Sequence, residues 1–205
     1  MNDLPIGWER VLLGEITTEP SQKIPAESDE FTYIDIGSID RATKKIIAPQ
    51  QLLGKDAPSR ARKLVQTGDT LVSMTRPNLN AVAHVPEYLS GQIASTVFDV
   101  LRPVGIDPRW VAYLVRTSNF ITEMTSLTQG ALYPAVRSKD IRTYSTPLAP
   151  ISEQKRIADK LDALLVQVDV CRNRLDKIPG IIKRFRQAVL GAATSGQLTN
   201  AWRNS

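Results

Sequence analysis

Histidine and cysteine occur once each in this 205-residue sequence, as His84 and Cys171. A single histidine does not support a metal site built on several imidazoles or a serine–histidine triad with a spare base. His84 lies in the apolar segment 81–85, so we expect an ordinary strand residue rather than a metal ligand. A single cysteine excludes an internal disulfide framework and is typical of a reducing cytoplasm.

Long hydrophobic runs and familiar catalytic motifs are also missing. No run of 18 apolar residues occurs, so we expect no membrane span, and the first four residues do not resemble a signal peptide. Residues 54–56, GKD, lack the spacing of a phosphate loop, and no G-x-G-x-x-G or Asn/Asp-Pro-Pro-Tyr/Phe sequence is present. We therefore expect a cytoplasmic protein that binds rather than catalyses and has no cofactor of its own.

Charge is divided unevenly along the chain. Acidic and basic side chains balance in residues 1–150, so the formal net charge of +5 lies entirely in residues 151–205. Most of it falls between Arg172 and Arg186. A basic segment beside a neutral domain suits a polyanion, although solvated coiled-coil faces are often basic without binding anything.

The most regular pattern is a heptad repeat near the C-terminus. An apolar residue recurs at alternating steps of four and three, which is the seam that one helix needs to lie along another. At ~1.5 Å per residue the helix would be on the order of 60 Å long. We predict a coiled-coil arm that pairs with a partner helix through this seam, with Cys171 as one of its small apolar residues. The seam residues are Ile157, Leu161, Leu164, Val168, Cys171, Leu175, Ile178, Ile182, Phe185 and Val189.

An alternative interpretation is an ordinary amphipathic helix packed on its own domain, but such helices rarely exceed 25 residues. Pro179 and Gly180 indicate a break, because proline removes a helical N–H and clashes with the carbonyl of Leu175. The four-residue step from Ile178 to Ile182 nevertheless keeps the seam in phase. We expect a kinked arm, or two helices end to end, rather than a hairpin.

The preceding 150 residues mix strand and helix patterns. Strands are expected after the turn at 4–8 and over 31–39, 70–74, 81–85 and 97–101. Residues 44–47 begin another segment, and a polar stretch follows it. One or two helices are expected between 107 and 129, starting at Asp107-Pro108, and a loop leads into a strand over 130–136. The predicted fold class is α+β, a mixed α/β domain over 1–150 followed by a long coiled-coil helical arm over 151–205.

Two loops carry side chains suited to reading DNA. Residues 75–80, TRPNLN, follow a buried strand, and arginine can bind guanine O6/N7 while asparagine binds adenine N6/N7. Residues 133–139, YPAVRSK, form a basic loop suited to phosphate contacts. The alternative is that Arg76 and Arg137 pair with carboxylates and the asparagines form turns. The candidates are Arg76, Asn78 and Asn80 for base edges, and Tyr133, Arg137 and Lys139 for the backbone or flanking bases.

The sequence resembles a known family at several places. Residues 147–157, PLAPISEQKRI, are similar to the P-L-x-P-x-x-E-Q-x-x-I junction of type I restriction-modification specificity (S) subunits. Residues 183–190, KRFRQAVL, then SGQLT at 195–199 and WR at 202–203, resemble the end of their conserved region. LPIGW at 4–8 and LGEI at 13–16 resemble the opening of a target recognition domain, and GDTLVS at 68–73 and GALYP at 130–134 match segments within it.

The resemblance implies a DNA-binding role. Such subunits carry two target recognition domains, each reading half of a split DNA site, held apart by an antiparallel coiled coil. They bind methyltransferase (M) subunits that use S-adenosylmethionine and restriction (R) subunits that use ATP.

This sequence matches one recognition domain, 1–150, and one conserved helix, 151–205. The resemblance therefore implies a non-catalytic half-subunit that pairs with a second copy through the arm, where M subunits also dock. The alternative from another class is a coiled-coil scaffold or regulator that binds protein through its globular domain.

Overall fold

The computed structural model describes residues 4–128 and 134–204 and divides the chain into two compact units, Met1–Asp159 and Lys160–Ser205. The long helix α4 (Ile151–Thr194) belongs to both. Its start agrees with the predicted arm, but its first nine residues pack with the globular unit, so the compact unit extends beyond residue 150. The α+β fold class is confirmed.

The first unit contains twelve strands and three helices besides the start of α4 within the described residues. The strands are β1 (Glu9–Leu12), β2 (Thr17–Thr18), β3 (Glu30–Ile34), β4 (Ile39–Asp40), β5 (Lys45–Ile46), β6 (Gln50–Leu53), β7 (Ala61–Leu64), β8 (Thr70–Ser73), β9 (Val82–His84), β10 (Ile93–Ser95), β11 (Phe98–Pro103) and β12 (Ser145–Leu148). The helices are α1 (Pro108–Leu114), α2 (Ser118–Ser126) and α3 (Ser138–Arg142), and the short 3-10 helices used below are η2 (Ile36–Ser38) and η4 (Pro77–Leu79).

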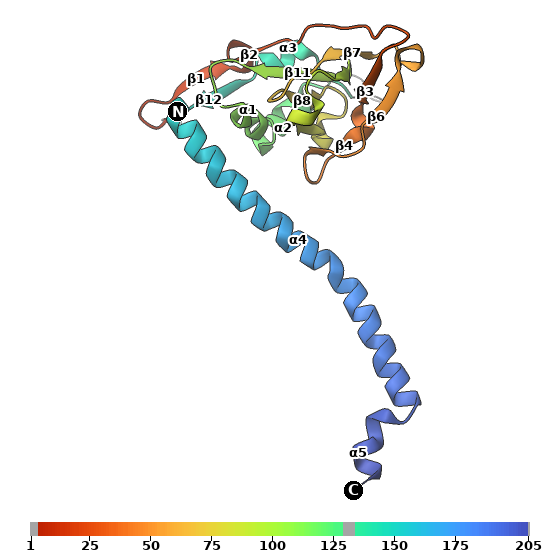
Figure 1. Cartoon of the computed structure of the whole chain (residues 1–205). Coiled ribbons are helices and arrows are strands. Elements are labelled where there is room, and N and C mark those ends of the chain that lie inside the picture. Colours follow the sequence, from red (N-terminus) through yellow and green to blue (C-terminus); the bar gives the residue numbers. More distant parts are fainter. Residues whose placement is uncertain (1–3, 129–133, 205) are drawn as a thin grey trace. The chain divides into compact units, whose positions relative to one another are not determined.

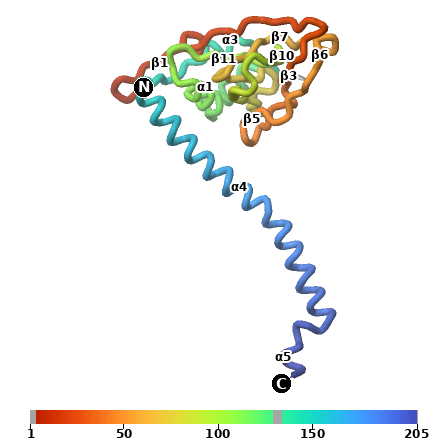
Figure 2. The backbone as a smooth tube through the Cα atoms, in the orientation of Figure 1, coloured from red at the N-terminus to blue at the C-terminus, as the bar shows by residue number. Residues whose placement is uncertain are grey.

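Two four-stranded sheets form the body of this unit, in the orders β6-β3-β10-β7 and β2-β11-β8-β9. Strands β3 and β10, far apart in the sequence, run parallel and side by side (Figure 2). The short pair β4-β5 forms a separate hairpin. Strand β1 pairs antiparallel with β12, the last strand before α4.

The second sheet has a hydrophobic core on each face. Because successive strand residues point to opposite faces, Val72 packs with the helices while its neighbour Leu71 packs toward the other sheet. Phe120 of α2 is buried in the first core and Phe98 of β11 in the second. Burying each such side chain contributes roughly 1.5–3 kcal/mol.

Several predicted elements are confirmed. β8, β9 and β11 lie where the apolar runs predicted strands, and His84 is a residue of β9. α1 begins after Asp107, whose side chain accepts a hydrogen bond from the Arg109 backbone N–H at 2.9 Å. This is the expected helix-capping geometry.

Two predictions were wrong in part. The strand predicted over 31–39 ends at Ile34, because the Asp35 carboxylate accepts the Ser38 N–H at 3.0 Å and starts η2. The polar stretch after residue 47 contains β6 and β7, which the sequence did not indicate. Both are the outer strands of their sheet, where exposed side chains can be polar, so no apolar alternation marks them.

The second unit consists of the rest of α4, the short 3-10 helix η6 (Gln197–Thr199) and α5 (Asn200–Arg203). Pro179 lies inside α4, and the helix continues through it (Figure 1). The two-helix version of the prediction is therefore wrong, and the chain forms no hairpin at this point. No helix among the described residues is long and apolar enough to cross a membrane.

Candidate nucleic-acid interface

The first predicted DNA-reading segment forms a tight loop, residues 75–80, which we call the η4 loop. The Leu79 N–H donates to the Arg76 carbonyl at 2.9 Å, and the Asn80 N–H donates to the Pro77 carbonyl at 2.9 Å. Arg76 and Asn80 flank η4, and both have left-handed backbone angles. Helix α2 packs against η4 and supports it from within the fold.

The second predicted segment runs beside the first. Thr75 and Ala135 form an isolated antiparallel bridge. The Arg76 N–H donates to the Pro134 carbonyl, and the Val136 N–H donates to the Met74 carbonyl, each at 2.8 Å. Two segments that the sequence singled out separately are therefore one continuous surface feature. Tyr133, also a candidate, lies outside the described residues.

Four of the candidate side chains are exposed on or near this feature. Arg76 and Asn78 are exposed on the η4 loop, and Arg137 and Lys139 are exposed at the start of α3. Within residues 4–128 and 134–204, Arg76 forms no ion pair, so the alternative that it neutralises a carboxylate finds no support there. The Arg137 backbone N–H donates to the Asp140 carboxylate at 2.8 Å, which fixes the start of α3.

Asn80 differs from Asn78, although both were predicted to read base edges. Only 7% of its surface is exposed, and its side-chain amide donates to the Val115 carbonyl at 2.8 Å. Its backbone carbonyl accepts a hydrogen bond from the Lys44 amine at 2.6 Å. The structure uses Asn80 inside the fold, so we assign it a structural role in place of the predicted base contact.

Further cations gather beside the η4 loop, and the sequence analysis did not identify them. Burial lowers the pKa of the Lys44 amine, and the neighbouring charges of Arg116 and Arg41 lower this pKa further, against the opposite effect of Asp40. Lys44 and Arg41 come from the β4-β5 turn, and Arg116 comes from the segment that follows α1. No local motif could have revealed this cluster, because it is assembled from two distant segments.

The start of α4 is attached to the globular unit by the junction motif. Gln154 is buried, its side-chain oxygen accepts the Asp107 N–H at 3.0 Å, and its side-chain amide donates to the Ala149 carbonyl at 2.7 Å. Glu153 accepts a hydrogen bond from the Trp8 indole at 3.0 Å. Gln154 therefore joins the start of α1 to the segment between β12 and α4.

A salt-bridge chain reinforces the same junction. Arg109 pairs with Asp107 at 2.9 Å and with Asp159 at 2.7 Å. The hydrogen bond from the Arg109 side chain is the main reason that the pKa of the Asp107 carboxyl lies below its usual value, despite the opposing effect of burial.

Other charged groups in the fold have structural partners. The guanidinium of Arg102 binds both oxygens of buried Asp69 at 2.9 and 2.8 Å, and Arg142 binds buried Asp99 at 3.0 Å. These aspartates hold neighbouring elements together. Among the described residues, no group of three histidine, cysteine, aspartate or glutamate side chains could hold a metal ion.

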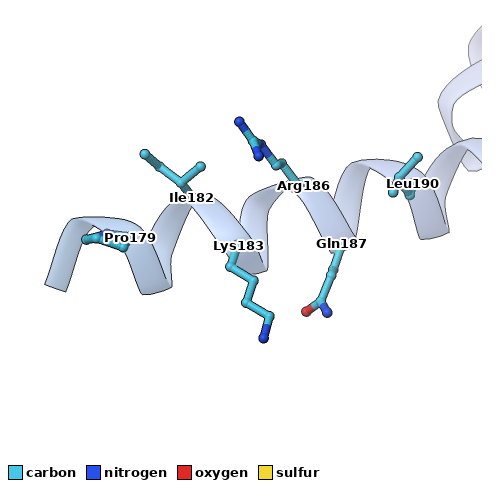
Figure 3. Close-up of a pocket in the computed structure, with 6 residues that line it drawn as sticks. All are labelled: Pro179, Ile182, Lys183, Arg186, Gln187 and Leu190. Atoms are coloured by element: carbon cyan, nitrogen blue, oxygen red, sulfur yellow. The ribbon is translucent and has the colours of Figure 1, made fainter.

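The second unit exposes the predicted seam. Leu175 is 62% exposed and Phe185 is 67% exposed, and Cys171 is also exposed. Apolar surface extends beyond the seam, into a shallow hollow in which basic side chains stand beside Pro179, Ile182 and Leu190 (Figure 3). The basic members are Lys183 and Arg186. The arm thus offers exposed apolar surface with positive charge at its edge.

Comparison with known proteins identifies relatives over most of the chain. The family model described as the type I restriction modification DNA specificity domain matches residues 5–179. The chain is 45% identical over 220 residues to the type I restriction enzyme StySPI specificity subunit of Salmonella potsdam, covering 98% of this chain and 46% of that protein. It is 31% identical over 211 residues to the EcoKI specificity subunit of Escherichia coli (strain K12), covering 98% and 44%.

Solved structures give the same result. The crystal structure of the HsdS subunit from Thermoanaerobacter tengcongensis matches with a TM-score of 0.78 and 39% identity, over 85% of this chain and 46% of that one. A chain solved to explain complex assembly and conformational transition of the type I R-M system matches with a TM-score of 0.86 and 35% identity, over 94% and 51%. The present chain spans about half the length of these relatives.

Proposed function

The chain belongs to the family of type I restriction-modification DNA specificity domains, and we propose that it acts as a half-subunit that reads one half of a bipartite DNA target. The observation that carries this proposal is the pairing of the η4 loop with residues 134–136, which joins the two candidate DNA-reading segments. The family model of a DNA specificity domain, which matches residues 5–179, supports the DNA-reading role.

Each exposed side chain suits a particular DNA contact. The guanidinium of Arg76 can bind guanine O6 and N7, and the Asn78 amide can bind adenine, each with ~1–3 kcal/mol of discrimination. Arg137 and Lys139 suit phosphate contacts, which position the protein without reading sequence. Tyr133 belongs to the same segment, and we retain it as a candidate for the backbone or a flanking base.

We propose that two copies pair through the seam in antiparallel orientation. The exposed apolar residues of the arm provide the surface for this contact. The antiparallel orientation is the one that the resemblance to specificity subunits implies. Charge does not decide it, because Asp162, Asp169 and Asp176 share one heptad position that lies off the seam.

The pair would assemble with M subunits, docked on the arm, and with R subunits, in the cytoplasm. The chain itself would contribute sequence recognition and no catalysis, in keeping with relatives that are named specificity subunits. Because two identical recognition domains related by a two-fold axis require a target of the same symmetry, the expected site is a gapped palindrome.

Selection from random DNA in the presence of purified M subunits tests the proposal. We expect enrichment of a short sequence, an unread spacer and the same sequence inverted, with binding that weakens steeply as salt rises. An asymmetric motif would mean that a different half supplies the second specificity. Recovery of no sequence, together with protein binding through the globular unit, would favour the scaffold alternative.

A further inference from the structure

Three non-glycine residues among those the structure describes have positive φ angles: Lys44 at 58°, Arg76 at 48° and Asn80 at 44°. Side chains with a Cβ rarely adopt this left-handed conformation, and such strain tends to persist at functional sites. Arg76 and Asn80 flank η4, and Lys44 contacts Asn80 from the β4-β5 turn. All three residues with a positive φ angle therefore lie at the ends of η4 or in contact with them.

The η4 loop is held at both ends by other elements. At its start, the Arg76 N–H donates to the Pro134 carbonyl at 2.8 Å. At its end, the Asn80 side chain donates to the Val115 carbonyl at 2.8 Å, and the Asn80 carbonyl accepts from the Lys44 amine at 2.6 Å. The exposed residue Asn78 lies between these attachments.

Holding a charged amine at residue 44 costs free energy. The amine is partly buried and lies near the positive charges of Arg116 and Arg41, which the negative charge of Asp40 opposes. A neutral side chain at this position would avoid the cost of burying a charge and the repulsion by the two arginines. The hydrogen bond to the end of the η4 loop is the favourable contact that the amine makes in return.

We propose that Lys44 is a positioning residue for sequence recognition: its amine fixes the end of the η4 loop and so sets the placement of Arg76 and Asn78. Lys44 does this from a separate hairpin and without reading a base itself. The inference rests on the proposed function of the η4 loop in DNA reading.

Lys44→Asn tests this inference, with Lys45→Asn as the matched control. Asparagine tolerates the left-handed conformation, so the turn is retained while the amine is lost. Lys45 is exposed on the same hairpin, so its variant removes the same charge without the loop contact. With M subunits present, Lys44→Asn should reduce the preference for the selected site over single-base variants by about tenfold at the positions the loop reads. Lys45→Asn should leave that preference unchanged.

Two further variants separate positioning from folding. Lys44→Gly relieves the backbone strain and should also lose the preference, whereas Lys44→Arg keeps a cationic donor and should restore part of it. Amide exchange at Leu79 and Asn80, measured without DNA, should accelerate in Lys44→Asn and Lys44→Gly but not in Lys45→Asn.

The outcomes are distinct. If the wild-type chain selects a motif and both neutral Lys44 variants keep the same base preference, the positioning role is overturned and the proposed function stands. An equal loss of affinity for every sequence would also overturn it, since that is the effect of charge alone. If the wild-type chain selects no motif, the proposed function itself fails, and the inference with it.

Discussion

The globular unit and the arm differ in how far they bury their apolar side chains and pair their charges. The globular unit buries its apolar residues in cores on both faces of a sheet and pairs its buried aspartates with arginines. The arm exposes apolar residues along most of its length and carries no acidic residue after Asp176. The first unit has the contacts of a folded domain, whereas the second leaves much of its apolar surface exposed.

The largest expected effect is on the pairing of the arm. Replacing Leu164 and Leu175 with Asp should convert a dimer into monomers, because burial of the ten seam residues is worth on the order of 10 kcal/mol before ordering costs. Light scattering at micromolar concentration should give about twice 22.7 kDa for the wild-type chain and 22.7 kDa for the variant. The control places the same charges off the seam, at Val166 and Asn173. A wild-type monomer at high concentration would contradict the prediction.

Replacing one phenylalanine in each unit compares how the two units contribute to stability. Phe98→Ala should destabilise the globular unit by about 3–5 kcal/mol, because it leaves a cavity at a fully buried position. Phe185→Ala, in the exposed arm, should leave that unfolding transition in place and weaken dimerisation instead. Urea denaturation can follow the fluorescence of Trp8 and Trp110, whose rings lie 5.6 Å apart, in a Trp202→Phe background. Equal destabilisation by both variants would show that the two units unfold together.

Replacing two glutamines of α4 should give a smaller difference in stability. Gln154→Ala removes the partners of the Asp107 N–H and the Ala149 carbonyl, and each unsatisfied group should cost about 1–3 kcal/mol. Gln167→Ala, at an exposed position on the same helix, should change stability by less than about 0.5 kcal/mol. Thermal unfolding measures both. Similar melting temperatures for the two variants would mean that Gln154 does not anchor the helix.

The smallest effects concern DNA. Arg76→Ala should relax one base position in both half-sites, with a loss of about 1–3 kcal/mol of discrimination. Lys139→Ala should weaken binding to all sequences alike and reduce the slope of log affinity against log salt by about one. Titrations at several salt concentrations with matched and single-mismatch duplexes separate the two effects. The assignment of Arg76 fails if its variant keeps the wild-type base preference.

The long helix α4, the start of α1 and the buried strands were predictable because each depends on local periodicity or capping. The edge strands β6 and β7 were not, since their mostly polar or small residues show no apolar alternation. The two candidate loops could be found separately, but their pairing through Thr75 and Ala135 depends on tertiary structure. Asn78 and Asn80 show the same limit: the turn of η4 exposes one and buries the other, and no difference in residue type distinguishes them.

The pairing of β1 with β12 brings the two ends of the recognition unit together, with Glu9 opposite Leu148. Domains with adjacent ends are readily exchanged, because replacing everything between the ends leaves the surrounding chain undisturbed. Residues 9–148 therefore have the topology of a removable cassette. Under the proposed function, a cassette grafted between the same two strands is expected to change the DNA preference and to leave the seam residues of α4 in place. Gln154 would keep its bond to the Ala149 carbonyl, and the new cassette would have to supply a donor where the Asp107 N–H now lies.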